Sequence, residues 1–277
     1  MKCNYHTHST YCDGKEPLEK FVTRAIEEEF DHLGFSSHAP IKRETDFGIK
    51  MENLPSYCNE INKLQEQYLN IKLLKGLECD FIPEISYNFS FFKHEYHLDY
   101  IIGGIHLVKP THRDELWFID GHDRNTYDNG LQHLFDGNIR QAVTTFWEQT
   151  FEMIETQNFD IIAHFDKIKM HNQNRFFTED EKWYRTLAEH ALYLIKRHNL
   201  IIELNSRGLY KKRCDSFYPS DFLTQLAAQQ DLPFVISSDA HKSEELIFLY
   251  NEALEHLKAL GIHRLLYFDN GWKEEFL

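Results

Sequence analysis

Short apolar runs alternate with amphipathic segments along most of the chain. The apolar runs are nearly continuous rather than alternating, and they are rich in large and β-branched residues. This pattern is typical of parallel strands that are covered on both faces. Counting the opening segment, we predict seven strands, at residues 2–6, 31–37, 71–78, 98–105, 159–164, 200–205 and 233–239.

Apolar residues at helical spacing occupy several of the intervals between these strands. They predict helices at residues 17–29, 54–68, 178–198 and 243–261. Strands that alternate with helices indicate an α/β fold, either a parallel barrel or a doubly wound sheet. Residues 107–138 fit neither pattern, and we expect a long loop there over one end of the barrel. Since we see no linker or composition shift, we expect a single domain over residues 1–277.

Composition narrows the classes of protein to consider. The net charge of −14 disfavours a large nucleic-acid interface, because phosphate backbones require a basic surface. The five cysteines are scattered without a C-x-x-C pair, which favours reduced thiols over disulfides or a thiolate zinc site. No run reaches the roughly 18 apolar residues of a membrane helix, and the first residues lack the apolar core of a signal peptide. We therefore expect a cytoplasmic protein without a membrane partner.

Residues of metal-ligand type follow nearly every predicted strand. In an α/β barrel the carboxyl ends of the strands and the loops after them form one shared mouth. We therefore expect these side chains to meet, together with an arginine that follows the sixth strand. The set comprises His6, His8, Asp13, His38, Glu78, His106, His164, Asp239 and His241, with Arg207 as the arginine.

Nine candidate ligands exceed the three or four protein ligands that one zinc ion requires. They predict two or three divalent ions that share a carboxylate. Mixed histidine and carboxylate ligands suit Zn²⁺, Mn²⁺ or Fe²⁺ better than Mg²⁺ or Ca²⁺, which prefer oxygen ligands. Paired ions of this kind can generate hydroxide at neutral pH and bind the oxygens of a phosphoryl group.

Several individual positions have more than one interpretation. Asp80 lies on the same strand face as Glu78 and competes with it as a ligand, although Glu78 is preferred at the strand end. Asp13 could start a turn with Gly14. Asp166 could orient a ligating histidine or cap a helix. Arg207 could bind phosphate or form a salt bridge at the rim.

The remaining basic and sulfur-containing residues receive ordinary interpretations. Cys12 has no visible thiolate-activating partner other than the metals, so we predict a small packing residue. The basic run 211–213 is expected to be a solvated loop. Surface or helix-end roles are expected for the other eleven histidines, namely His32, His94, His97, His112, His122, His133, His171, His190, His198, His256 and His263.

Six motifs in order resemble the PHP-domain (polymerase and histidinol phosphatase) metallophosphoesterases. They are HTHSTYCDG, SSHAP, GLECD, GGIHLV, AHFDKIK and SSDAH. The match runs in order from residue 4 to residue 241. The resemblance implies a distorted (β/α)7 TIM-like barrel with a trinuclear metal site at its carboxyl face. It implies that one ion is held by His6, His8, Glu78 and Asp239, a second by Glu78, His106 and His164, and a third by Asp13, His38 and His241.

Within this family, three segments are most similar to the stand-alone histidinol-phosphate phosphatases. They are WFIDG (117–121), HFDKIKMHN (164–172) and ELNSRGLYKK (203–212). This likeness implies hydrolysis of the small phosphate ester L-histidinol phosphate in histidine biosynthesis, with Glu78, Asp239 and Arg207 as catalytic residues and Arg207 on the phosphate. Three alternatives remain: a phosphoesterase for another small phosphate or nucleotide, a metal-dependent amide or ester hydrolase, and a metal-binding module without activity.

Overall fold

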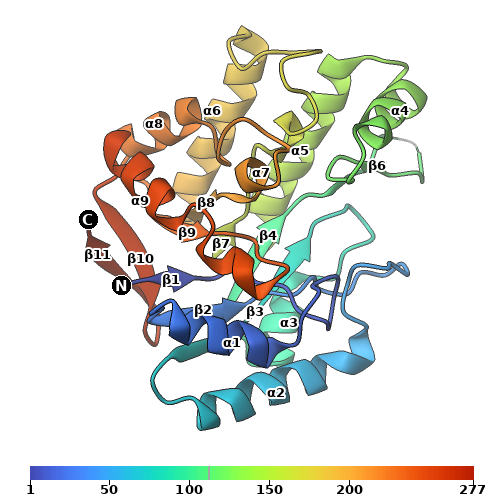
Figure 1. Ribbon diagram of the computed structural model, residues 1–277. Coiled ribbons are helices and arrows are strands. Elements are labelled where there is room, and N and C mark those ends of the chain that lie inside the picture. The colour runs from blue at the N-terminus through green and yellow to red at the C-terminus, as the bar shows by residue number, and fades with distance from the viewer. Residues whose placement is uncertain (112) are drawn as a thin grey trace.

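In the computed structural model, seven parallel strands follow one another around a single sheet (Figure 1). The structure describes residues 1–111 and 113–277, so the expectation for His112 lies outside it. Each strand corresponds to one predicted range, and the predicted parallel α/β fold is confirmed. The strands are β1 (Cys3–Asn4), β2 (His32–Phe35), β3 (Lys72–Asp80), β4 (Tyr100–Gly104), β7 (Ile161–Ile162), β8 (Ile201–Asn205) and β9 (Phe234–Ser237).

The first and last of these seven strands meet beyond their carboxyl ends. Thr7 and Ala240 form a parallel bridge. His8 N donates to the Ala240 carbonyl at 2.8 Å, and Ala240 N donates to the His6 carbonyl at 3.1 Å. The two ends of the strand order are thus joined, as in a barrel, next to the histidines that follow β1.

Apolar side chains from the strands fill the interior of the barrel. They form one buried cluster of Cys3, Tyr5, Leu74, Tyr100, Ile102, Ile161, Ala163, Ile201 and Val235. The Tyr100 hydroxyl lies in this interior, where it donates to the Tyr5 carbonyl at 2.5 Å and lies 3.1 Å from the Phe35 carbonyl. A Cβ at Gly34 or Gly76 would lie 2.4 Å from an atom of Tyr100, so both positions require glycine.

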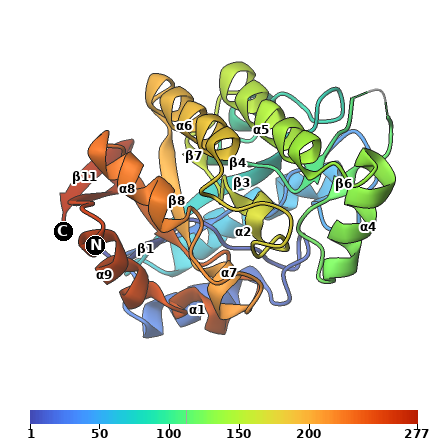
Figure 2. The ribbon, with the colours of Figure 1, turned by 90° about the horizontal axis from the view of Figure 1, so that it is seen from above.

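Amphipathic helices surround the strands and bury their apolar faces in a second, larger cluster (Figure 2). The ridge of apolar residues on α1, for example, contributes Leu18, Phe21, Val22 and Ala25. These outer helices are α1 (Leu18–Glu27), α2 (Leu54–Gln67), α3 (Phe89–Glu95), α5 (Ile139–Thr156), α6 (Lys182–Arg197), α8 (Asp221–Gln229) and α9 (Tyr250–Ala259). Among the described residues, no helix is both long enough and apolar enough to span a membrane.

Two predicted helices differ from the observed ones at their boundaries. The helix predicted to start at Thr178 begins at Lys182, because residues 178–181 form a turn in which the Glu181 carboxylate accepts the Thr178 N–H at 3.0 Å. The helix predicted over 243–261 is divided into the 3-10 helix η3 (Ser243–Ile247) and α9. Leu249, with a φ of 60°, separates the two parts.

The expected loop at residues 107–138 is largely structured. It contains the two-stranded antiparallel hairpin of β5 (Leu107–Val108) and β6 (Trp117–Phe118), followed by α4 (Arg124–Phe135). The expectation of a long irregular loop is therefore wrong over much of this segment. Buried Trp117 explains the order, since its indole nitrogen donates to the Tyr127 carbonyl at 2.9 Å and so joins β6 to α4.

Three further short elements lie between the strands and the outer helices along the chain. They are the 3-10 helices η1 (Met51–Asn53) and η2 (Lys167–Lys169) and the one-turn helix α7 (Arg207–Tyr210). The last two follow β7 and β8 directly, so their basic residues lie near the barrel mouth.

The sequence analysis missed a C-terminal hairpin of β10 (Arg264–Phe268) and β11 (Trp272–Phe276). β10 pairs in parallel with the first residue of β9, and β11 pairs with β10 in antiparallel fashion beside the N-terminus (Figure 1). The Trp272 ring lies 5.2 Å from the ring of Tyr5 and 6.3 Å from that of Tyr100, centroid to centroid. The hairpin therefore covers the amino end of the barrel interior.

We expect Trp272→Ala to lower the free energy of unfolding by about 2–3 kcal/mol, less than for a fully buried tryptophan because Trp272 is only half-buried. Denaturant unfolding measures the loss. Phe276→Ala on the same strand is the matched control, because Phe276 is 77% exposed and should be near neutral. Equal midpoints for the two variants would show that the hairpin does not support the barrel interior.

Candidate metal centre

The structure brings all nine predicted ligand residues together at the carboxyl side of the barrel. They fall into five overlapping groups in which the possible ligand atoms lie within 4.8 Å of one another. Of the seven parallel strands, all but β8 have a candidate ligand at their carboxyl end or in the segment after it. The groups are His8, Asp13, His38 and His241; His6, His164 and Asp239; His6, His8 and Glu78; His38, Asp80 and His106; and Glu78, His106 and His164.

Glu78 lies at the middle of these groups, and its two carboxylate oxygens face different histidines. The side chain is buried at the end of β3. Such a carboxylate is suited to bridge two ions, because each oxygen has its own set of imidazoles. Oε2 lies 3.1–3.4 Å from ring nitrogens of His6, His8 and His38, and Oε1 lies 3.1–3.5 Å from ring nitrogens of His164 and His106.

Several of the buried ring nitrogens have no hydrogen-bond partner among the described residues. They include Nε2 of His6, Nε2 of His8 and Nδ1 of His38. Buried polar atoms in native proteins are nearly always satisfied, so such a cluster requires an explanation. Two ligand atoms that each lie about 2.1 Å from a shared zinc ion are separated by about 3.0–3.4 Å. The spacing around Glu78 matches this separation, so these residues fit divalent ions.

The electrostatics of the centre favour a bound cation. Burial alone would raise the pKa of Glu78, but His6 and its neighbouring histidines lower this pKa well below its usual value. Burial would also lower the pKa of His6, yet Glu78, Glu203 and Asp239 raise it well above its ordinary value. Positive charge is therefore stabilised at this position. Burial and the neighbouring His241 lower the pKa of His8 to about 3, which leaves its imidazole neutral for coordination.

Two buried carboxylates contact the Nδ1 atoms of candidate ligands. Asp80, the alternative to Glu78, accepts hydrogen bonds from the His106 backbone N–H at 3.1 Å and from its Nδ1 at 2.5 Å, which leaves Nε2 facing Glu78. Glu203 lies 2.6 Å from Nδ1 of His6. The sequence analysis missed Glu203, although a carboxylate inside the apolar run LIIELN was a usable signal.

A cavity of about 260 Å³ opens beside the centre. Glu78, His106, Asp239 and other candidate ligands line one side of it. Three cationic side chains, from Lys15, Arg207 and Arg213, line the same space, so the cavity suits an anionic ligand. Its remaining lining residues are Asp46, Phe47, Phe118, Asp120 and His122.

Arg207 forms an ion pair with Asp239 and also lines the cavity. Its side chain lines the cavity, and its guanidinium NH1 donates to the Asp239 carbonyl at 2.7 Å. The guanidinium Nε also lies 3.8 Å from the Asp239 carboxylate. The ion pair therefore holds the arginine at the mouth, next to a candidate metal ligand.

The structure corrects three other interpretations. Arg213 is not part of a solvated loop, since it lines the cavity, contacts His122 and lies 3.9 Å from Asp120. His122 consequently lies at the site rather than in an ordinary surface position. Asp166 neither orients a candidate ligand nor caps a helix with its side chain. It accepts from Ser220 N at 2.8 Å and pairs with Lys169 at 2.7 Å.

Lys167 and Asp120 were also missed. The Lys167 ammonium is buried and lies 2.7 Å from the Asp120 carboxylate, which lines the cavity. Asp120 belongs to the segment expected as a loop, and although it lies within WFIDG it was not singled out as a site residue. Cys12 packs at the edge of the core with its sulfur 3.5 Å from Nδ1 of His8, in agreement with a small packing residue.

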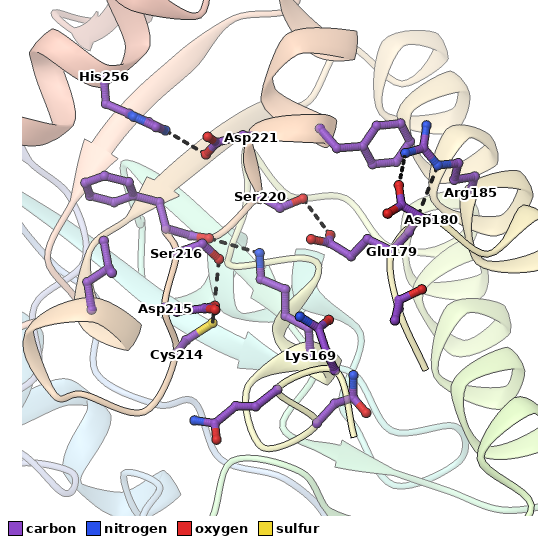
Figure 3. Close-up of a pocket in the computed structure, with 17 residues that line it drawn as sticks. Lys169, Glu179, Asp180, Arg185, Cys214, Asp215, Ser216, Ser220, Asp221 and His256 are labelled. Carbon is purple, nitrogen blue, oxygen red and sulfur yellow. Dashed lines mark hydrogen bonds and ion pairs between the residues drawn. The ribbon is translucent and has the colours of Figure 1, made fainter. Parts of the chain in front are cut away.

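A larger hollow of about 650 Å³ lies elsewhere, between η2 and α8 (Figure 3). Its charged side chains are largely paired with neighbours in the hollow itself. Ser220 donates to Glu179, Arg185 pairs with Asp180, and His256 pairs with Asp221. None of the five ligand groups formed by the described residues includes a residue that lines this hollow. The smaller cavity is therefore the candidate active site.

Known proteins are similar to this chain in both sequence and fold. A Deinococcus radiodurans protein named as a probable histidinol-phosphatase is 26% identical over 269 residues, which covers 94% of each chain. A Listeria monocytogenes structure, described as that of a candidate histidinol phosphatase, has a TM-score of 0.79 at 24% identity and covers 91% of this chain and 99% of its own. Histidinol phosphate phosphatase from Lactococcus lactis, solved with zinc, L-histidinol and phosphate, has a TM-score of 0.68 at 20% identity and covers 98% of both chains.

The family model of the PHP domain matches residues 4–207 of this sequence. This span runs from the last residue of β1 to beyond β8 and contains seven of the nine candidate ligands. The remaining two, Asp239 and His241, complete the same cluster after β9. The chain therefore belongs to the PHP-domain family.

Proposed function

We propose that the protein is a metal-dependent phosphatase that hydrolyses L-histidinol phosphate to L-histidinol and phosphate. The observation that carries this proposal is that nine candidate metal ligands and three cationic side chains line or adjoin one small cavity. Metal ions and cations together provide the charge that a phosphate dianion requires. The names of the full-length relatives, and the L-histidinol and phosphate in the Lactococcus lactis structure, support this choice of substrate.

We further propose that two or three divalent ions, of zinc, manganese or iron, occupy the centre. Zinc in the Lactococcus lactis structure supports the metal class. Glu78 would be shared between two ions, in keeping with the different histidines that face its two oxygens. The first ion would take His6, His8, Glu78 and Asp239, the second Glu78, His106 and His164, and the third Asp13, His38 and His241.

Bound divalent ions supply a hydroxide nucleophile at neutral pH and withdraw charge from the phosphoryl oxygens. The protein contributes a preorganised cation, Arg207, whose position is held by the Asp239 carbonyl. A guanidinium held in place before reaction can stabilise charge that develops on the phosphoryl group without reorganisation. Lys167 adds a buried ammonium that is ion-paired with Asp120, a residue that lines the cavity.

The organic part of the substrate has complementary surfaces in the same cavity. Phe47 and Phe118 offer aromatic faces for an imidazole ring, and Asp46 offers a carboxylate for an ammonium group.

All five cysteines are free in the structure, which supports a reducing, cytoplasmic location.

A different small phosphate monoester is the second candidate substrate. The observation that favours it is that the metal ligands and Arg207 would recognise the phosphate, which all such esters share. Selectivity between esters then depends on Phe47, Phe118 and Asp46, which line the cavity and would contact the organic part of the substrate. A substrate panel separates the two candidates.

We expect phosphate release from L-histidinol phosphate to exceed that from sugar phosphates and nucleoside monophosphates. Treatment with a chelator should abolish the activity, and addition of Mn²⁺ or Zn²⁺ should restore it, because the candidate ligands are placed for divalent ions. Released phosphate is measured against time for each ester. Equal rates on all esters would keep the metal centre and exclude the histidinol assignment.

Substitution Glu78→Gln should lower both metal content and kcat/KM. We expect a loss in kcat/KM of more than about 100-fold, because a ligand shared by two ions matters more than a residue that only supports a ligand. Metal analysis and phosphate release measure the two effects. Glu84→Gln, at an exposed glutamate that pairs with Lys109, is the control and should behave like the parent protein. Full activity of Glu78→Gln would contradict a bridging role.

Substitution Arg207→Lys should lower kcat/KM roughly 10- to 100-fold, because the ammonium keeps the charge but loses the planar set of donors. Metal content should stay at the parent level, since Arg207 is not a ligand. Arg264→Lys is the matched control, because Arg264 on β10 also pairs with an aspartate, Asp231, but does not line the cavity. A variant that loses metal in proportion to activity would show that Arg207 acts only by holding Asp239.

A further inference from the structure

Glu203 is a fully buried carboxylate in the middle of β8, the one parallel strand that provides no candidate metal ligand. Burial of a charged carboxylate is costly unless hydrogen bonds satisfy it. The reaction proposed above assigns it no role. Its hydrogen bonds nevertheless connect it to two of the candidate ligands.

Both oxygens of Glu203 are occupied by donors from the metal centre and its surroundings. Oε1 lies 2.6 Å from Nδ1 of His6. Oε2 accepts the backbone N–H of His164 at 3.0 Å and the Asn205 side-chain amide at 3.0 Å. One side chain thus joins the segment after β1 to the segment after β7, and it contacts a ligand proposed for each of two different ions.

The contact with His6 sets which ring nitrogen is available to a metal. A proton on Nδ1 is stabilised by Glu203, so Nε2 keeps its lone pair and faces Glu78 at 3.1 Å. Histidines that bind metals commonly donate their other ring N–H to a carboxylate in this way, which fixes the tautomer and the ring orientation. Since the His6 ring is wholly buried, bulk solvent does not reach it to replace this partner.

The contact with His164 holds a backbone conformation that is rare for this type of residue. His164 has a φ of 25°, in a region that residues other than glycine seldom occupy. Such conformations cost of order 1–3 kcal/mol and persist only where the surroundings hold them. The hydrogen bond from the His164 backbone N–H to Glu203 is one such restraint. In this conformation Nε2 of His164 lies 3.1 Å from Oε1 of Glu78.

We propose that Glu203 is a positioning residue that orients His6 and His164 together, so that one buried carboxylate aligns the ligands of both ions that share Glu78. This inference rests on the proposed metal assignment. It does not depend on the identity of the phosphate ester.

The first test is the affinity of the Glu203→Gln variant for Mn²⁺, measured by competition with a chelating dye. The amide presents one acceptor and one donor group, so it cannot accept from His6 and His164 through both ends. We expect the affinity to fall about 10- to 100-fold, the usual effect of losing a partner of a metal ligand. Affinity equal to that of the parent protein would overturn the proposal.

Glu203→Asp separates positioning from charge. The aspartate keeps the negative charge, but its carboxylate is one methylene too short to reach both histidines at the observed distances. A loss of affinity in Glu203→Asp supports positioning. Parent-like affinity in Glu203→Asp, combined with a loss in Glu203→Gln, would show that the charge alone matters and would overturn the proposal.

Asp160→Asn is the matched control for general destabilisation. Asp160 is also a carboxylate that accepts a backbone N–H of the barrel, from Ile101 at 2.9 Å, and it contacts Trp272 at the end away from the metal centre. We expect this variant to melt at a lower temperature than the parent protein and to bind Mn²⁺ with the parent affinity. Equal losses of affinity in Asp160→Asn and Glu203→Gln would assign both effects to the fold and contradict positioning.

A measurement on the unsubstituted protein guards against variants that fail to fold. In the zinc-loaded protein labelled with ¹⁵N-histidine, the His6 signal should show a proton on Nδ1 and metal on Nε2. The signal is assigned by its absence from His6→Gln. A proton on Nε2 would overturn the proposal. Neither this spectrum nor the Mn²⁺ competition uses a substrate, so failure of the histidinol assignment would be recognised separately.

Discussion

The carboxylate of Glu78, buried among five imidazole rings, is the interaction on which the site depends. Its oxygens lie 3.1–3.5 Å from ring nitrogens that come from the segments after four different strands. Without a cation, several of these nitrogens are buried without partners, and the free energy of that burial is unfavourable. The barrel must therefore hold the strand ends rigidly enough to keep these buried polar groups together.

The two ends of the barrel perform different tasks. The interior below the centre is apolar, from Tyr5 and Tyr100 down to Trp272 in the C-terminal hairpin, and it provides the stability. The carboxyl end carries the charged residues, where a parallel barrel gathers the ends of all its strands. Because the apolar interior and the polar centre are stacked along one axis, the strained residue His164 can be held by neighbours whose own positions are set by packing.

Around the candidate ligands lies a set of residues that hold them in place. Asp80 orients His106, Glu203 orients His6, and the Asp239 carbonyl holds Arg207. In both histidines the contact uses Nδ1, while Nε2 faces Glu78. A phosphatase that relies on metal ions and fixed cations requires this order, since the charges must be in position before the substrate arrives.

The sequence by itself determined the parallel α/β fold, the seven strands and the nine residues that gather at the mouth. The strands follow from local signals, because buried parallel strands appear in a sequence as continuous apolar runs. The gathering of the nine residues follows because the carboxyl ends of all strands in a parallel barrel lie on one face. The local signals did not predict three features: the helix boundary at Lys182, the hairpin of β10 and β11, and the structured segment around Trp117. They depend on contacts with distant parts of the chain, such as that between Trp272 and Tyr5.

Only the tertiary structure decided which polar residues support the ligands and which line the cavity. Glu203 and Glu78 are both carboxylates within apolar strands, and nothing local distinguishes a residue that faces the centre from one that lies behind His6. Arg213 and Asp120 reach the cavity from segments that showed no regular pattern. Such roles depend on distances of 3–4 Å between residues far apart in the chain, and spacing along a sequence does not contain those distances.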